Sequence, residues 1–138
     1  MNDNSLVIHT DGGSRGNPGP AASAFVVENN GKKIFEGSKY LGKTTNNVAE
    51  YQGVIIALDW LLSSKEINVS SITFILDSEL IVKQINGSYK VKDENLKKLY
   101  IEVKSLIGKI DQKIIFKNVL RNENKEADFL VNMELDRQ

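Results

Sequence analysis

The chain has 138 residues, 41% of them hydrophobic, and its lysine and arginine side chains balance its aspartate and glutamate side chains at 18 each. This length and composition suit one compact domain with its own core, so we expect residues 1–138 to form a single domain. The absence of cysteine excludes disulfides, thiol catalysis and cysteine–zinc sites, and the balanced charge gives no indication of a polyanionic partner.

The N-terminal residues 1–5 are polar, and no apolar run approaches the roughly 20 residues that a membrane helix needs. We therefore expect no secretion signal, no membrane association and a cytoplasmic location. No feature of the sequence requires more than a monomer.

The first half of the chain predicts three strands and a helix. Alternating β-branched residues predict a strand over residues 5–10, which we expect to end in a turn-rich loop that starts at Asp11. Two further strands, over residues 24–28 and 33–41, are joined at an Asn-Gly pair, which is a strong hairpin signal. Apolar residues at helical spacing then predict a helix over residues 46–62.

The second half alternates strands and helices. Its periodicity predicts a strand over residues 72–76, a short helix from Ser78 to about Gly87, an amphipathic helix over 95–107, a strand over 113–119 and a closing helix over 124–135. The order βββαβααβα implies an α/β fold with a mixed five-stranded sheet and helices packed on its faces.

Four carboxylates fall at the ends of these predicted elements: Asp11, Glu50, Asp77 and Asp128. Each has an ordinary structural explanation when it is taken alone. Asp11 could form a turn before the glycines, and Glu50 could complete a capping box that begins at Asn47. Asp77 and Asp128 could stabilise the starts of the helices that follow or contain them.

Glu50 points to a different interpretation. It shares a helical face with Val54 and Leu58, which must face the sheet, so its carboxylate is expected to point inward. A buried carboxylate is costly unless it is paired, and no basic residue lies three or four positions away. Carboxylates without histidine or cysteine suit Mg²⁺, with Mn²⁺ able to substitute, which favours phosphoryl-transfer chemistry at two metal ions.

Four motifs resemble those of the type 1 ribonuclease H family. Residues 10–21, with the sequence TDGGSRGNPGPA, are similar to its long opening motif. Residues 44–50, 77–80 and 124–128 resemble its second, third and fourth motifs, in the same order. The resemblance covers nearly the whole chain, and the predicted element order fits the ribonuclease H-like fold of that family.

The resemblance implies an endonuclease that hydrolyses the RNA strand of RNA–DNA hybrids by two-metal-ion catalysis and leaves 5′-phosphate and 3′-hydroxyl ends. It assigns catalysis and metal binding to Asp11, Glu50, Asp77 and Asp128. It assigns minor-groove contacts to Asn17, Asn46 and Asn47, a DNA phosphate to Thr45, and close approach of the RNA to Gly12 and Gly13.

The sequence departs from the family pattern in two places, and in both it resembles a subgroup. The loop before the last helix lacks the histidine that many members carry, and we expect Arg121 to replace it electrostatically. The basic protrusion after the third motif is shortened, so Lys90 and Lys92 are expected to bind phosphate in its place. His9, the one histidine, matches a position that is usually an aromatic core residue.

Three alternatives remain open at this point. The chain could be the detached nuclease domain of a reverse transcriptase, or a non-catalytic module that binds hybrids. It could also be another enzyme on a related fold, such as a transposase, a resolvase or a sugar kinase, because fold alone does not determine function.

Overall fold

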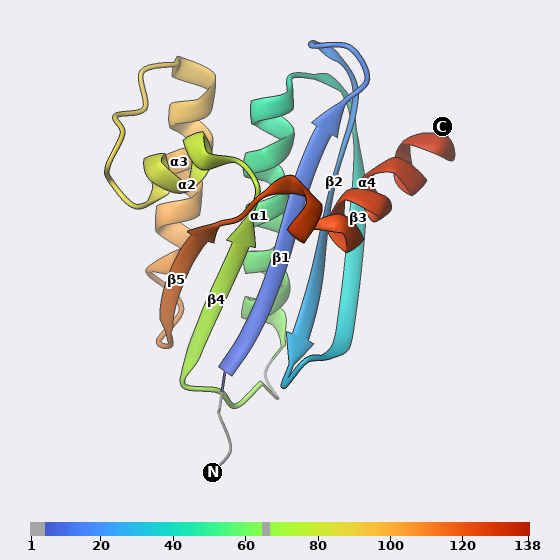
Figure 1. Ribbon diagram of the computed structural model, residues 1–138. Helices are drawn as coiled ribbons and strands as arrows, with labels where there is room; N and C mark the ends of the chain where they lie inside the picture. Colours follow the sequence, from blue (N-terminus) through green and yellow to red (C-terminus); the bar gives the residue numbers. More distant parts are fainter. Residues whose placement is uncertain (1–4, 65–66) are drawn as a thin grey trace.

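The computed structural model describes residues 5–64 and 67–138, so the N-terminal segment predicted to carry no secretion signal lies largely outside the described residues. The described residues form a five-stranded sheet with the strand order β3-β2-β1-β4-β5 and with helices on its faces (Figure 1). The elements in chain order are β1 (Ser5–Ser14), β2 (Gly19–Asn29), β3 (Lys32–Thr44), α1 (Asn46–Ser63), β4 (Ser71–Leu76), α2 (Glu79–Ile85), α3 (Glu94–Ile107), β5 (Lys113–Asn118), the 3₁₀ helix η1 (Arg121–Glu123) and α4 (Lys125–Asp136).

The predicted fold class and element order are confirmed. Strands β1, β2 and β3 pair antiparallel, whereas β4 runs parallel to β1 and β5 runs parallel to β4. The sheet is therefore mixed, and β1 is the strand at which its direction of pairing changes.

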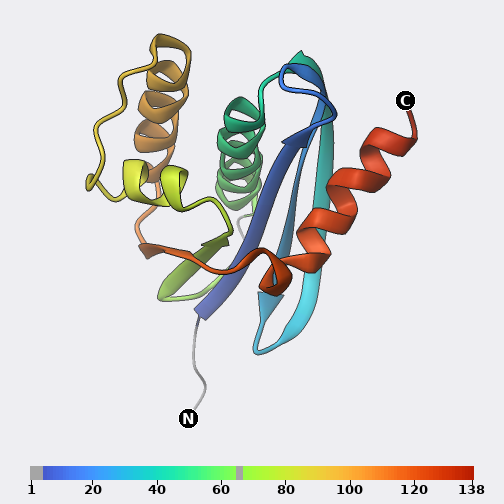
Figure 2. The same cartoon turned by 45° about the horizontal axis from the view of Figure 1, so that its top comes forward.

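Helices cover both faces of the sheet. α1 packs against one face, with α2 and α3 beside it, and α4 crosses the other face over β2 (Figure 2). The main core lies on the α1 face and a smaller one lies beneath α4, where Ala22 and Ala24 of β2 contact Val131 and Leu135. Among the described residues, no helix combines the length and the apolar character that crossing a membrane requires.

The hairpin between β2 and β3 has the predicted turn. Asn30 and Gly31 have positive φ angles of 54° and 77°, which a two-residue turn of type I′ requires at both central positions. The backbone twist of this turn matches that of the flanking strands, so the Asn-Gly pair sets the register of the hairpin.

The predicted end of the first strand is wrong. β1 continues from Thr10 to Ser14, because this segment pairs with β2 from Asp11 opposite Ala24 to Ser14 opposite Ala21. The glycines that suggested a loop are tolerated within the strand because the partner strand supplies the hydrogen bonds. Asp11 therefore lies within a strand and is not a turn residue. The 3₁₀ turn η1 before α4 was also not predicted.

Candidate active site

The carboxylates meet where β1 extends beyond its parallel neighbour. β4 pairs with β1 only as far as His9, and β1 continues past that point with Asp11. Asp77 directly follows the last residue of β4. Ligand sites in sheets of this kind form beyond the carboxyl ends of parallel strands, where the connections part.

The structure brings three of the four predicted carboxylates into one group. Asp11, Glu50 and Asp77 each offer an oxygen, and these oxygens all lie within 4.8 Å of one another. Asp11 and Glu50 are buried, with 7% and 8% of their surfaces exposed. The predicted inward orientation of Glu50 is therefore confirmed.

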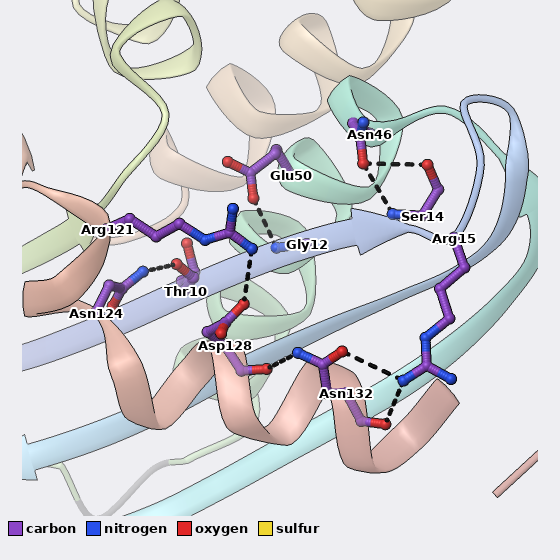
Figure 3. A network of polar contacts seen from close by, with 10 residues as sticks. All are labelled: Thr10, Gly12, Ser14, Arg15, Asn46, Glu50, Arg121, Asn124, Asp128 and Asn132. Carbon is purple, nitrogen blue, oxygen red and sulfur yellow. Dashed lines mark hydrogen bonds and ion pairs between the residues drawn. The ribbon is translucent and has the colours of Figure 1, made fainter. Parts of the chain in front are cut away.

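Asp128 lies in the same cleft but outside this group. It projects from the first turn of α4, and its Oδ1 lies 3.6 Å from Nη2 of Arg121 (Figure 3). The cleft has a volume of about 320 Å³, and all four carboxylates line it together with Gly12, Gly13, Asn46, Asn47 and Arg121.

None of the capping roles considered for Glu50 and Asp77 is observed. Thr45 caps α1 by accepting a hydrogen bond from the Val48 N–H, and Ser78 caps α2 in the same way. Glu50 Oε1 instead accepts a hydrogen bond of 2.6 Å from the Gly12 N–H of β1. The N-caps of α1 and α2 are thus made by hydroxyl groups, and the carboxylates of Glu50 and Asp77 line the cleft.

The electrostatics of the group disfavour negative charge. Burial raises the pKa of Asp11 to about 7, although a hydrogen bond with Glu50 opposes the rise. Burial and then the charge of Asp11 raise the pKa of Glu50 well above its ordinary value. Burial also raises the pKa of Asp77, whose Oδ2 is buried without a hydrogen-bond partner.

These observations fit a hard divalent cation. The donor set is made of carboxylate oxygens close to one another, and ions such as Mg²⁺ and Mn²⁺ prefer oxygen ligands. A cation would relieve the repulsion between the buried carboxylates and would give the orphaned Oδ2 of Asp77 a partner. Asp11, Glu50 and Asp77 therefore form a metal-binding acidic cluster.

The raised pKa of Asp11 predicts how pH affects the metal-free chain. The folded value is about 7 and the ordinary value is 3.8, so the proton on this group stabilises the fold fully below pH 3.8, and this contribution is lost as pH rises through about 7. In chelator, thermal melts should show a lower Tm at pH 8 than at pH 5. Mg²⁺ should raise the Tm at pH 8, and Asp11→Asn should reduce the difference between the two pH values, although Glu50 and Asp77 still contribute to it. A wild-type profile parallel to that of Asp11→Asn would contradict this assignment.

Two glycines allow α1 to lie directly against β1 beside the carboxylates. A Cβ at Gly12 would overlap the backbone carbonyl of Ala49, and one at Gly53 would lie 2.8 Å from the backbone oxygen of Asp11. Ser23 of β2 also stabilises this close approach, because its Oγ donates a hydrogen bond of 2.7 Å to the Ala49 oxygen of α1. This close approach brings Glu50 alongside Asp11.

The predicted substrate-binding residues line the cleft and an adjoining hollow. Asn46 Oδ1 accepts hydrogen bonds from the backbone N–H and the Oγ of Ser14, as Figure 3 shows, and Asn17 Oδ1 accepts one from the Asn46 N–H. A hollow of about 250 Å³ is lined by Asn17, Thr45 and Asn47 among others, and Asn47 also lines the main cleft. The predicted set therefore forms one continuous surface.

The accessory residues fall in two places. Arg121 lines the carboxylate cleft, with 81% of its side chain exposed. Lys90 lines a separate hollow of about 480 Å³ beside Tyr89 and Tyr100, and Lys92 is exposed nearby in the chain. The structure therefore does not bring Lys90 and Lys92 into the carboxylate cleft.

Sequence analysis gave no role to several residues around the cleft. Asn132 lines it and accepts hydrogen bonds from Arg15 through its backbone and side-chain oxygens. Arg15 also forms an ion pair of 2.7 Å with Asp136. These contacts tie α4 to the end of β1. Asn132 lies four residues after Asp128, and this helical spacing could have indicated that the two side chains share one face of the helix.

The sheet order, the helix α4 across one face and the acidic cluster at the end of β1 define a ribonuclease H-like α/β domain with a metal-binding site. A family model described as "Reverse transcriptase-like" matches residues 9–134. The chain belongs to the ribonuclease H family within this group.

Individual relatives agree with this assignment. Ribonuclease HI of Halobacterium salinarum is 37% identical over 91% of this chain and 62% of its own length. A bifunctional protein of Mycobacterium tuberculosis is 38% identical over 95% of this chain and 35% of its own length. The chain thus spans from about a third to under two thirds of the length of these curated relatives.

Solved structures resemble the chain over a larger share of their length. The structure of LC11-RNase H1 in complex with an RNA/DNA hybrid has a TM-score of 0.89 and 39% identity, and the match covers 96% of this chain and 97% of that one. The likeness extends over the whole sheet and its helices.

Proposed function

We propose that the chain is a ribonuclease H, an endonuclease that hydrolyses the RNA strand of RNA–DNA hybrids and leaves 5′-phosphate and 3′-hydroxyl ends. The observation that carries the proposal is the convergence of Asp11, Glu50 and Asp77 within 4.8 Å, with Asp128 in the same cleft. The hybrid bound to LC11-RNase H1 supports the choice of substrate.

Mg²⁺ is the proposed ion, with two ions at each site and Mn²⁺ as a substitute. Asp11, Glu50 and Asp77 would hold the ions, with Asp128 at the edge of the group. When bound, the ions supply Lewis-acid stabilisation of the negative charge that develops during phosphoryl transfer.

The protein groups around the cluster orient the carboxylates and meet the substrate. The Gly12 N–H holds Glu50 Oε1 in place. Arg121 presents a largely exposed guanidinium beside Asp128, where it can attract a phosphate of the RNA strand. This role would compensate for the absence of a histidine in the loop over residues 120–124.

The asparagines supply the groups that distinguish RNA from DNA. Ser14 occupies Oδ1 of Asn46, which leaves the amide N–H₂ of Asn46 as a donor at the cleft. Asn17, Asn47 and Thr45 continue this polar surface into the adjoining hollow. Amides bind both base edges in the minor groove and the 2′-hydroxyl, which only the RNA strand carries.

A panel of three duplexes tests this proposal. An end-labelled RNA–DNA hybrid, duplex DNA and duplex RNA are each incubated with the chain and Mg²⁺. We expect internal cuts in the RNA of the hybrid alone. Cleavage of duplex DNA at the same rate would favour a transposase or resolvase activity. Hybrid binding in chelator without cleavage under Mg²⁺ or Mn²⁺ would favour a non-catalytic binding module.

Lys90 and Lys92 are proposed to bind phosphates of the hybrid, so affinity should depend on salt. Each lost phosphate contact lowers the slope of log affinity against log salt by about 0.7–0.9. The variant with both lysines changed to alanine should therefore have a slope smaller by about 1.5, measured with Ca²⁺ in place of Mg²⁺ to prevent cleavage. Lys113→Ala, at the exposed start of β5, serves as the control. An unchanged slope in the double variant would remove the two lysines from the interface.

A further inference from the structure

Asn124 occupies the N-cap position of α4 but does not cap it. An asparagine at this position ordinarily accepts a hydrogen bond from the first turn of its own helix, which contributes about 1 kcal/mol. The Asn124 side chain makes no such bond, and only 1% of its surface is exposed. A buried amide that does not cap its own helix must form its hydrogen bonds with other groups.

The amide of Asn124 reaches across to β1. Its Nδ2 donates a hydrogen bond of 2.8 Å to the backbone oxygen of Thr10, which Figure 3 shows, and its Oδ1 lies 3.1 Å from Nδ1 of His9. Because Nδ2 faces the Thr10 carbonyl, Oδ1 is the acceptor, and Nδ1 of His9 carries the hydrogen. Turning the amide over would place two oxygens together at Thr10.

These bonds join the two elements that carry Asp11 and Asp128. Thr10 directly precedes Asp11, and the backbone oxygen of Asn124 accepts a hydrogen bond of 3.2 Å from the Asp128 N–H. Asn124 also lowers the pKa of Asp77, against the burial that raises it. Asn124 thus bonds to the strand through its side-chain amide and to the first turn of the helix through its backbone oxygen.

His9 is the residue that binds the oxygen end of this amide. It shares a face of β1 with Asp11, two residues later, as alternate residues of a strand do. Its other ring nitrogen, Nε2, lies 3.8 Å from Oε1 of Glu28, beyond hydrogen-bonding distance. Among the described residues, the contact with Asn124 is therefore the polar contact of the imidazole that is short enough for a hydrogen bond.

We propose that His9 is a positioning residue that acts through Asn124: its hydrogen bond to Oδ1 holds in place the amide that ties Thr10 of β1 to the start of α4. The activity part of this inference rests on the proposed ribonuclease H function, whereas its structural part does not. The alternative is that His9 merely fills space between the sheet and α4.

Two substitutions separate positioning from packing. His9→Phe keeps a ring of similar size without the donor, and His9→Asn keeps a donor near the place of Nδ1 in a smaller side chain. We expect His9→Phe to lower kcat for the hybrid by about 10-fold, with KM unchanged, and to weaken Mn²⁺ binding measured by calorimetry, since residues that orient metal ligands contribute about this much. His9→Asn should restore most of both. Glu28→Gln, which leaves the bond to Asn124 intact, should change neither by more than about twofold.

A double-mutant cycle shows whether His9 acts through Asn124. In the Asn124→Ala background, His9→Phe should have no further effect on kcat or on Mn²⁺ affinity. Equal effects of His9→Phe in both backgrounds, or the same loss in His9→Asn as in His9→Phe, would overturn the inference. Thermal melts of each variant identify any that does not fold, and the comparison is then made with Asn124→Ser, which removes the amide but keeps a residue favoured at the N-cap.

An NMR measurement without metal or substrate tests the orientation itself. The side-chain amide protons of Asn124 should exchange slowly with solvent in the wild type and in His9→Asn, and at least about 10-fold faster in His9→Phe. Equal exchange in all three would overturn the inference. A wild type that cleaves no hybrid but shows the expected exchange would contradict the proposed function and leave the positioning role in place.

Discussion

Replacing Asp11 by asparagine should abolish cleavage and at the same time stabilise the metal-free chain. The substitution removes one of three ligand oxygens that lie within 4.8 Å of one another, so we expect a loss of hybrid cleavage of about 10³-fold or more. It also removes a buried charge whose pKa is raised to about 7. We therefore expect the free energy of unfolding in chelator at pH 8 to rise by about 1–3 kcal/mol, which is several degrees in Tm.

Thermal melts with and without Mg²⁺ check this prediction. Wild-type Tm should rise on addition of Mg²⁺ at pH 8, whereas the Tm of Asp11→Asn should not respond. Asp59→Asn, an equal change of charge at an exposed position of α1, is the control and should alter stability by less than about 0.5 kcal/mol. An Asp11→Asn chain that is less stable than the wild type in chelator would show that this carboxylate has a structural role.

Gly12→Ala should be the most destabilising single change near the site. The new methyl group would overlap the Ala49 carbonyl, and backbone atoms on both sides leave no flexible side chain to move aside. We expect a loss of about 3 kcal/mol or more in the free energy of unfolding. Movement of α1 away from β1 would also separate Glu50 from Asp11, so cleavage should fall even in the fraction that folds.

The adjacent residue provides a matched control. At Gly13 the nearest atom to a new Cβ is 3.9 Å away, which is an ordinary van der Waals distance. Gly13→Ala should therefore change the free energy of unfolding by less than about 1 kcal/mol in urea denaturation. Equal effects of the two substitutions would contradict the close approach of α1 to β1 described above.

Elements with a strong local pattern were predictable from the sequence. Apolar spacing indicated that Glu50 lies on the sheet-facing side of α1, and 8% exposure confirms this. Asn30-Gly31 specified its turn type because few residues adopt two successive positive φ angles. In both cases the residues that cause the structure are close together in the sequence.

Other features depend on contacts between distant segments. The extension of β1 through Gly12 and Gly13 arises from pairing with β2, which no local propensity expresses. Gly53 lies within a helix, where glycine lowers stability by about 1 kcal/mol relative to alanine. The structure explains its presence, because a Cβ at this position would lie too close to the backbone oxygen of Asp11. The resemblance to the family motifs predicted that the four carboxylates belong to one site. It did not predict that Asp128 lies apart from the other three, beside Arg121, because that position depends on how α4 packs on the sheet.

The measurement that most directly tests the central claim is cleavage of a hybrid labelled on both strands, with wild type and Asp11→Asn compared in Mg²⁺ and in chelator. We predict that the wild type cuts the RNA strand internally in Mg²⁺, leaves the DNA strand intact and is inactive in chelator, and that Asp11→Asn is inactive throughout. Cleavage of the DNA strand, RNA cleavage that persists in chelator, or undiminished activity of Asp11→Asn would contradict the account.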